Sequence, residues 1–220
     1  MADFAASLSL EDLREEYKRG ALDEVNCDPN PMEQFRRWIQ EARAAQLKEP
    51  NAMTLSTATP DGRPSGRMML LKEVSELGFV FYTNYLSRKG REVETNPFVA
   101  LTFYWAELAR QVRVEGRARR LSREQSAVYF QTRPKGSRLS AWASRQSEPL
   151  PSRAPLETRL RDLQQQYGAN DEIPLPEYWG GYCVSPRLIE FWQGRPNRMH
   201  DRLVYRRKGE ETWFMERLSP

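Results

Sequence analysis

The sequence predicts an α+β protein, mainly antiparallel β, whose strands form a closed or nearly closed barrel with flanking helices. Three observations favour this class. At least five strand-like segments are bounded by turn residues, helical patterns are interspersed between them, and no regular alternation of strand and helix indicates a parallel sheet. With 220 residues, 39% of them apolar, the chain can build a sizeable core.

The first firm helix signal begins at Asn30. Asn30 can cap the helix, Pro31 suits its first turn, and the apolar residues that follow recur on one face. That face, which we expect to pack on the core, consists of Phe35, Trp38, Ile39 and Ala42. Further along, Ser122 and Gln125 have the spacing of a capping box for a helix through Phe130. The other predicted helices are residues 10–19, which end before Gly20, and residues 155–167.

Strand signals fill most of the remaining chain. The predicted strands are residues 53–59, 64–73, 78–83, 98–105, 111–119, 180–184, 203–207 and 212–217. A Pro60-Asp61-Gly62 turn separates the first two. In residues 111–119 apolar or small residues alternate with polar ones, which is typical of a strand with one solvated face. Residues 189–192 are apolar enough for either a strand or a short helix.

The charge balance indicates anionic partners. The chain has 34 Lys and Arg against 30 Asp and Glu, a net charge of +4, and arginine suits phosphate recognition. The arginines form no single run and no nucleic-acid motif is present, so we expect no nucleic-acid partner. Neither GxGxxG nor GxxxxGK[ST] occurs, and any phosphate must therefore be held by side chains.

Cysteine usage and hydropathy indicate where in the cell the protein is located and which partners to expect. Cys27 and Cys183 form no CxxC pair, so the sequence predicts no metal site and no disulfide framework. No run of 18 apolar residues occurs, and we expect no membrane partner. A reduced, cytoplasmic location agrees best with these features.

Three short basic sets are candidate phosphate sites. They are Arg67 with Lys72 in RMMLLK, Ser87-Arg88-Lys89, and Arg133 to Ser137 in RPKGS. Each places a cation near a hydroxyl or a turn, which favours charge-assisted contacts to phosphate oxygens. Taken singly, each set is more typical of a solvated surface charge. As a strand, RMMLLK places Arg67 and Lys72 on opposite faces, where they either serve two different groups or emerge at the barrel rims.

His200 is the only histidine in the chain, and Arg198 and Arg202 flank it. In an extended segment the three side chains share one face, where they repel unless an anion or an electron-rich ring lies between them. Two nearby cations should lower the pKa of the imidazole, so that it is neutral near pH 7 and can both accept and donate a hydrogen bond. The alternative is a structural histidine.

The segment Ile189-Glu190-Phe191-Trp192-Gln193, followed after four residues by Arg198-Met199-His200-Asp201-Arg202, resembles the signature of the pyridoxine (pyridoxamine) 5'-phosphate oxidases. The resemblance extends from LREEY at residues 13–17 through RMMLLK, FYTNYLSRKG and RQVRVEG to the C-terminal ERLSP. It implies an FMN-binding split barrel, Greek-key-like and six-stranded, with flanking helices. Residues 1–20 would be a mobile lid and residues 21–220 a single domain.

The resemblance also implies a function. Members of this family oxidise pyridoxine 5'-phosphate and pyridoxamine 5'-phosphate to pyridoxal 5'-phosphate, with hydride transfer from C4' to flavin N5 and reduction of O2 to H2O2. They act as homodimers with FMN at the subunit interface. The alternatives are a related split-barrel flavin oxidase, such as the phenazine-pathway group, or a non-catalytic carrier of FMN or pyridoxal phosphate. Lys72 and Ser137 favour the vitamin B6 activity.

Site residues follow from the same resemblance, position by position. The implied cofactor-binding residues are Arg67, Met68, Met69, Leu70, Leu71, Lys72, Tyr82, Thr83, Arg88, Lys89, Gln111, Gln146, Ser147, Trp192 and Arg202. The implied substrate-binding residues are Arg14, Tyr17, Lys72, Tyr129, Arg133, Ser137, Arg198 and His200, of which Arg198 and His200 are expected to be catalytic.

Overall fold

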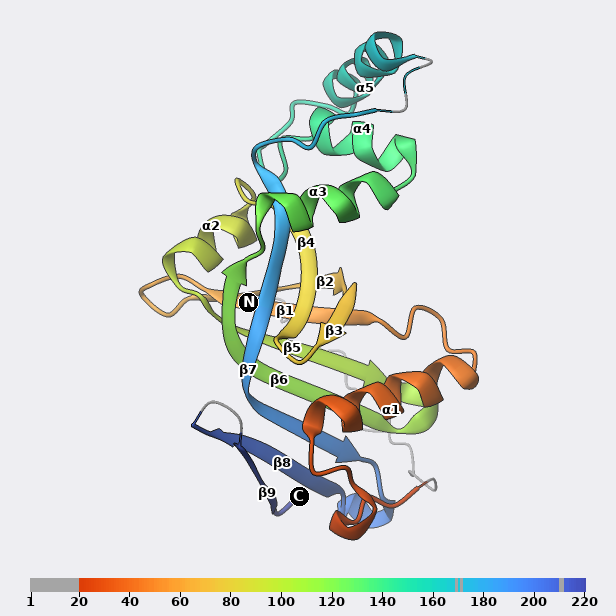
Figure 1. The fold of residues 1–220 in the computed structure, drawn as a ribbon, viewed down its shortest axis with the longest axis vertical. Coiled ribbons are helices and arrows are strands. Elements are labelled where there is room, and N and C mark those ends of the chain that lie inside the picture. Colours follow the sequence, from red (N-terminus) through yellow and green to blue (C-terminus); the bar gives the residue numbers. More distant parts are fainter. Residues whose placement is uncertain (1–19, 169, 171, 210–211) are drawn as a thin grey trace, which may run out of the picture.

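The computed structural model describes residues 20–168, 170, 172–209 and 212–220, and Figure 1 shows an elongated molecule built around one curled sheet. Helices α3 to α5 lie at one end, and the last two strands lie at the other. The helices are α1 (Pro31–Ala44), α2 (Arg88–Thr95), α3 (Arg123–Thr132), α4 (Lys135–Ala143) and α5 (Ala154–Tyr167), with 3-10 turns η1 (Glu24–Asn26), η2 (Ala106–Leu108) and η3 (Pro196–Arg198).

Within the described residues, nine strands form a single sheet. They are β1 (Ala52–Ala58), β2 (Pro64–Leu70), β3 (Glu73–Ser75), β4 (Gly78–Asn84), β5 (Phe98–Trp105), β6 (Arg110–Arg120), β7 (Trp179–Gln193), β8 (Asp201–Lys208) and β9 (Thr212–Arg217). Their pairings are antiparallel, and the main path runs β2-β1-β5-β6-β7-β4-β3. This confirms the predicted split barrel, although the sheet has nine strands rather than six.

The two ends of this path meet at Leu71 and Lys72. The Leu71 amide donates to the Asn51 carbonyl beside β1 over 2.9 Å, and the Lys72 amide donates to Val80 of β4 over 2.8 Å. The chain therefore turns a corner here and bridges the two edges of the sheet. The prediction of one strand over 64–73 is wrong for this reason, because the corner divides it into β2 and β3.

Strand β7 is the common element of the sheet. Residues 182–193 of β7 pair with β6 on one edge, while β4 pairs with residues 179–184 and β8 with residues 188–193 on the other. Leu188 lies opposite Glu115 and Pro186 opposite Gly116, so Arg187 is an extra residue in a β-bulge. A Cβ on Gly116 would lie 2.4 Å from the Ser185 carbonyl oxygen, which explains the glycine.

The barrel core is apolar and continuous with α1. Phe35 of α1 contacts Phe79 and Phe103 edge-on at 5.0 and 4.9 Å between ring centroids. The predicted cap is confirmed, since the Asn30 side chain accepts from the Met32 amide. A second, smaller apolar cluster lies under α3 to α5 and contains Phe130, Leu139, Ile173 and Trp179.

Some of the sequence-based expectations concern residues that the structure does not describe. The predicted helix at 10–19 and the lid residues Arg14 and Tyr17 lie outside the described residues.

Among the described helices, none is long and apolar enough to cross a membrane. The described part of the chain also holds no group of three His, Cys, Asp or Glu residues suited to a metal ion. Cys27 and Cys183 are free thiols.

Candidate active site

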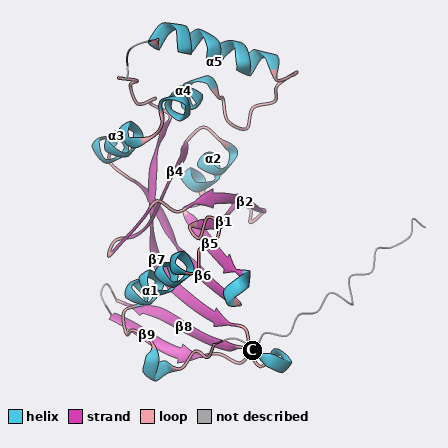
Figure 2. Ribbon diagram, turned by 90° about the vertical axis from the view of Figure 1, so that its right-hand side faces the viewer, coloured by secondary structure: helices cyan, strands magenta, loops and turns pink. Residues whose placement is uncertain are grey.

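A cavity of about 690 Å³ opens where α3 and α4 meet the ends of β2, β4 and β7. Figure 2 shows α2, α3 and α4 gathered around this end of the sheet. The cavity brings together residues from all three basic sets. The predicted residues that line it are Met68, Met69, Leu70, Lys72, Tyr82, Thr83, Lys89, Tyr129, Arg133, Ser137 and Gln146. These predicted residues therefore lie together at one cavity, and their roles there stay predictions.

Lys89 is a buried cation surrounded by neutral oxygens. Its Nζ donates to Gln146 Oε1 at 2.8 Å, Thr83 Oγ1 at 3.2 Å and Ser87 Oγ at 3.4 Å. Burial, with the nearby Arg67 charge, lowers the pKa of Lys89 to about 8. A desolvated ammonium beside a second cation gains most from an anion with several oxygens. These donors suit the phosphate of FMN.

The affinity for FMN is expected to depend on this ammonium group. Because the pKa of Lys89 is about 8 in the FMN-free protein, affinity should fall about twofold between pH 7 and 8 and should approach a tenfold fall per unit above that. Quenching of FMN fluorescence measures the dissociation constant at each pH. Lys89→Arg keeps the charge at every pH, so its curve should stay flat. Equal pH dependence in both proteins would assign the effect to another group.

Arg67 is not part of the cavity lining. It lies behind the cation cradle, which we define as Lys89 with its partners Thr83, Ser87 and Gln146. Its Nη1 donates to the Leu55 carbonyl at 3.0 Å and to Thr57, and its Nη2 contacts Ser65 and Glu92. The guanidinium is therefore held by protein acceptors and acts on Lys89 through its charge. The implied direct contact of Arg67 with FMN remains a prediction.

Arg88, Ser147 and Leu71 also lie outside the cavity lining. The Arg88 amide donates to Ser147 Oγ at 3.1 Å, which joins the start of α2 to the segment after α4. Ser147 has φ 75°, a left-handed conformation that is costly for a residue with a side chain and is often kept at functional sites. Leu71 is buried in the core at the barrel corner.

The opposite wall of the cavity is aromatic. The rings of Tyr82 and Tyr129 stack at 3.8 Å between centroids, and Tyr82 also stacks on Trp179 at 5.5 Å. The Arg133 guanidinium lies 4.7 Å from the Trp179 ring centroid. Its buried Nη1 has no hydrogen-bond partner among the described residues, and burial lowers the pKa of this group. An unpartnered guanidinium against flat rings suits a phosphorylated aromatic ligand.

Trp179 was missed by the sequence analysis. It precedes the predicted strand at 180–184, and a single tryptophan before a strand is read as core by default. Only the fold places it beside Tyr82, which is on the neighbouring strand β4. Its proximity to the Gly180-Gly181 pair, where the Tyr85 and Tyr82 side chains leave no room for a Cβ, is the one local signal that could have identified it.

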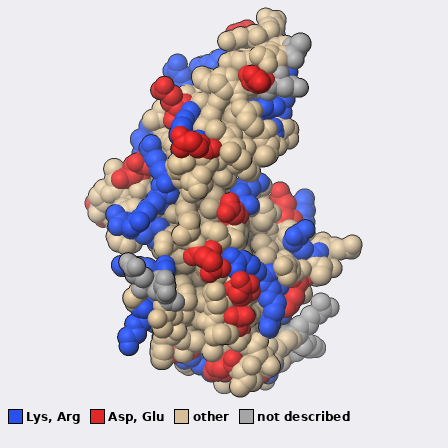
Figure 3. Space-filling model, viewed as in Figure 1, with Lys and Arg blue, Asp and Glu red and all other residues tan. Residues whose placement is uncertain are grey.

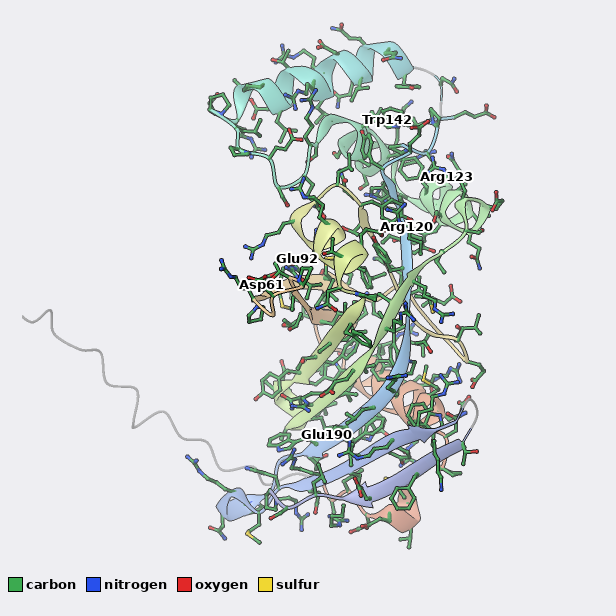
Figure 4. All side chains as sticks on the ribbon, turned by 90° about the vertical axis from the view of Figure 1, so that its left-hand side faces the viewer. Asp61, Glu92, Arg120, Arg123, Trp142 and Glu190 are labelled. Carbon is green, nitrogen blue, oxygen red and sulfur yellow. The ribbon has the colours of Figure 1, made fainter. Side chains whose placement is uncertain are left out.

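A second group of implied residues lies at the other end of β7. Gln111, Trp192 and Arg202 are register partners across β6, β7 and β8, so they form one row on one face of the sheet. Arg202 Nε donates to Glu190 Oε1 at 2.9 Å, and the Glu190 side chain is only 4% exposed. Figure 4 shows Glu190 at the opposite end of the sheet from Trp142 and Arg123.

The two groups do not meet within one chain. Trp179 is the first residue of β7 and Trp192 is the last but one. The thirteen positions between them correspond to about 43 Å along an extended strand. No residue of the Trp192 row is among the described residues that line the 690 Å³ cavity. Arg198 and His200 are absent from that lining as well.

His200 lies in the loop between β7 and β8. The expected extended segment is wrong, because Pro196–Arg198 is a 3-10 turn with φ 55° at Asn197 and 60° at Arg198. The lowered pKa of His200 is confirmed, but burial is the largest cause and Arg198 the second, while Asp201 opposes them. Arg202 is paired with Glu190 instead. On the face shown in Figure 3, basic and acidic groups are interspersed without one continuous basic stripe.

A curled antiparallel half-barrel with a buried cation cradle and an aromatic wall defines the class of FMN-binding split-barrel proteins. The family model described as Pyridoxamine 5'-phosphate oxidase matches residues 39–167, and that of the pyridoxine 5'-phosphate oxidase C-terminal dimerisation region matches residues 179–220. The chain belongs to the pyridoxamine 5'-phosphate oxidase family, a family of oxidoreductases, and its cofactor is FMN.

Relatives of known name are similar over nearly the whole chain. A pyridoxine/pyridoxamine 5'-phosphate oxidase from Rubrobacter xylanophilus is 59% identical over 215 residues, covering 98% of both chains. One from Trichormus variabilis is 55% identical over 96% of this chain and 99% of its own. The crystal structure of PhzG from Burkholderia lata with tetrahydrophenazine-1-carboxylic acid has a TM-score of 0.87 at 29% identity, covering 94% and 100%. An FMN-binding protein from Nostoc punctiforme, with a TM-score of 0.70 at 18% identity over 88% and 100%, shares the fold.

Proposed function

We propose that this protein oxidises pyridoxine 5'-phosphate and pyridoxamine 5'-phosphate to pyridoxal 5'-phosphate, with O2 reduced to H2O2. The observation that carries the proposal is the cavity, in which the unpartnered Arg133 guanidinium lies beside Lys72, Ser137 and a stacked aromatic wall. The names of the relatives support the same substrates. A phosphorylated pyridine offers both an anion and a flat ring.

Each part of the cavity has a separate task in this proposal. Lys89, Thr83 and Gln146 hold the FMN phosphate, while Lys72, Tyr129, Arg133 and Ser137 hold that of the substrate. FMN, when bound, supplies the acceptor for two electrons from substrate C4' and passes them to dioxygen. The protein binds and orients the reacting groups within the cavity. Arg198 covers the exposed side of the substrate, and His200 contacts its polar groups.

The proposed assembly is a homodimer with FMN at the interface. Within one chain the cavity and the Trp192 row lie at opposite ends of β7, so a second copy must bring its own row to each cavity. Trp192 and Arg202 of the row, together with the His200 loop, lie within residues 179–220, the stretch that matches a dimerisation region, whereas Gln111 of the row belongs to β6. Each dimer would then contain two complete sites. Residues 1–20 as a lid over these sites remain part of this proposal.

Anaerobic reduction tests the activity directly. Adding pyridoxamine 5'-phosphate to the FMN-loaded protein without oxygen should bleach the visible flavin absorbance. This half-reaction consumes water and releases pyridoxal 5'-phosphate and ammonia, and admitting air should then restore the colour and yield one H2O2 for each pyridoxal 5'-phosphate formed. An unchanged spectrum with both phosphorylated vitamers would contradict the proposal. Bleaching by a reduced phenazine carboxylic acid alone would indicate a PhzG-like activity, for which the fold similarity is the supporting observation.

A further inference from the structure

The loop of residues 194–200 is fixed at its first end. The Gly194 amide donates to the Ala109 carbonyl at 2.7 Å, and the Gln193 side chain donates to Leu108 and Ala109 carbonyls at 3.1 Å each. Arg195 Nη1 donates to the Gly20 carbonyl at 2.6 Å. The backbone at Arg195 is therefore held against the start of β6 and against the segment that begins at residue 20.

Asp201 closes the loop at its other end. Its Oδ1 accepts from Arg217 Nη1 of β9 at 2.8 Å, and its Oδ2 accepts from the Leu22 amide at 3.1 Å. The same Oδ2 lies 3.6 Å from Arg195 Nε, and the Asp201 side chain is only 17% exposed. One carboxylate thus links both ends of the loop to β9 and to the segment around Leu22.

The loop geometry determines which nitrogen of His200 carries the proton. The Arg195 backbone amide donates to His200 Nδ1 at 3.1 Å, and a backbone N–H can only donate. Nδ1 must therefore keep its lone pair, which places the proton of the neutral ring on Nε2. The Trp192 ring lies 4.7 Å from the imidazole, and the charged groups that act on it are Arg198 and Asp201.

We propose that Asp201 is a positioning residue that holds the loop so that Arg195 fixes His200 as its Nε2–H tautomer. Towards a ligand the neutral ring then donates from Nε2 and does not accept there. This differs from the sequence-based expectation of a ring that both accepts and donates. The contact of Nε2–H with substrate rests on the proposed function, whereas the tautomer and its dependence on Asp201 do not.

A single histidine makes the test unusually direct, because 15N-histidine labelling gives one pair of imidazole signals. The FMN-loaded protein without substrate should show Nδ1 as the unprotonated nitrogen, with protonation below pH 6.5. In Asp201→Asn the ratio of the Nε2–H tautomer to the Nδ1–H tautomer should fall by about 2- to 10-fold, which corresponds to the net free energy of one hydrogen bond. Release of the ring from burial raises the protonation midpoint and loss of the Asp201 charge lowers it, so the tautomer ratio decides the test. Glu216→Gln is the matched control, since Glu216 pairs with Arg206 at 2.7 Å between the same strands, outside the loop.

Two results would overturn the proposal. One is an unchanged pair of signals in Asp201→Asn, and the other is a lower midpoint with an unchanged tautomer, which is the effect of lost charge alone. Should Asp201→Asn fail to fold, Arg195→Gln removes the same link from the other side and should weaken the tautomer preference likewise. Because no turnover is involved, failure here and failure of the anaerobic assay are separate results.

Discussion

Pyridoxine without its 5'-phosphate is expected to have a kcat/KM about 10² to 10⁶ below that of pyridoxine 5'-phosphate, because two or three charge-assisted bonds of about 1.5–3 kcal/mol each are lost. The bonds in question come from Lys72, Arg133 and Ser137, which line one cavity. Arg133 is expected to contribute most of this loss. Its buried Nη1 has no hydrogen-bond partner among the described residues, and a bound ligand would supply one. Steady-state kinetics with both compounds measures the ratio.

The variant Arg133→Met isolates this contribution. It should lower kcat/KM for pyridoxine 5'-phosphate by about 10- to 150-fold while leaving the slow reaction of pyridoxine nearly unchanged. The melting temperature should change little, because the substitution removes a buried Nη1 that has no hydrogen-bond partner among the described residues and keeps an apolar side chain against the Trp179 ring. Lys135→Met removes a charge two residues away but outside the cavity lining, and should change neither value. Equal kcat/KM for the two substrates would contradict the assigned phosphate site.

Glu92→Gln is expected to lower the free energy of unfolding at pH 7 by an amount of the order of 3 kcal/mol. The Glu92 side chain is 6% exposed and accepts from Thr57 Oγ1 at 2.5 Å, Ser65 Oγ at 2.6 Å and Arg88 Nε at 2.8 Å. Burial alone would raise the pKa of this carboxyl, but these hydrogen bonds outweigh it and lower the pKa to about 2.

The sign of the pH dependence follows from that pKa. A carboxyl titrating near 2 in the folded chain and near 4.5 in the unfolded chain stabilises the fold fully above pH 4.5. This stabilisation is lost as the pH falls from about 4.5 to about 2. Urea unfolding between pH 7 and pH 3 should therefore show a shallower loss in Glu92→Gln than in the unsubstituted protein. Glu157→Gln breaks an exposed pair with Arg153 and should change little, and a steep loss retained in Glu92→Gln would contradict the assignment.

Sequence patterns that span only a few residues predicted much of the fold. Alternation identified β6 almost to the residue, and the Asn30 cap and the Ser122–Gln125 capping box predicted α1 and α3. These features act within a few residues of chain, so the sequence alone contains them. The short helices α2 and α4 were missed, because each begins in a basic, glycine-containing stretch that also reads as a loop. Packing against distant elements, which no local pattern reports, decides such segments.

The site was predicted to a similar degree and for the same reason. Residues of RMMLLK and RPKGS, which the sequence offered as candidate phosphate sites, line the cavity, but the partner of each charge depends on the fold. Arg67 is occupied by β1 and Glu92, and Arg202 is neutralised by Glu190. The carboxylate of Asp201, which the sequence presents only as a neighbour of His200, acts through Arg217 and Leu22. Such pairings connect residues far apart in the chain.

The β-bulge in β7 limits how this chain can change in length. Before the bulge the core-facing residues have even numbers, Tyr182 and Val184, and after it they have odd numbers, Ile189 and Phe191. Loss or gain of one residue in this strand would turn Ile189 and Phe191 outward and bring Glu190 and Trp192 into the core. Substitutions in β7 are therefore tolerable wherever size and polarity are kept, whereas a single-codon insertion or deletion there separates the row at Trp192 from the face on which it must lie.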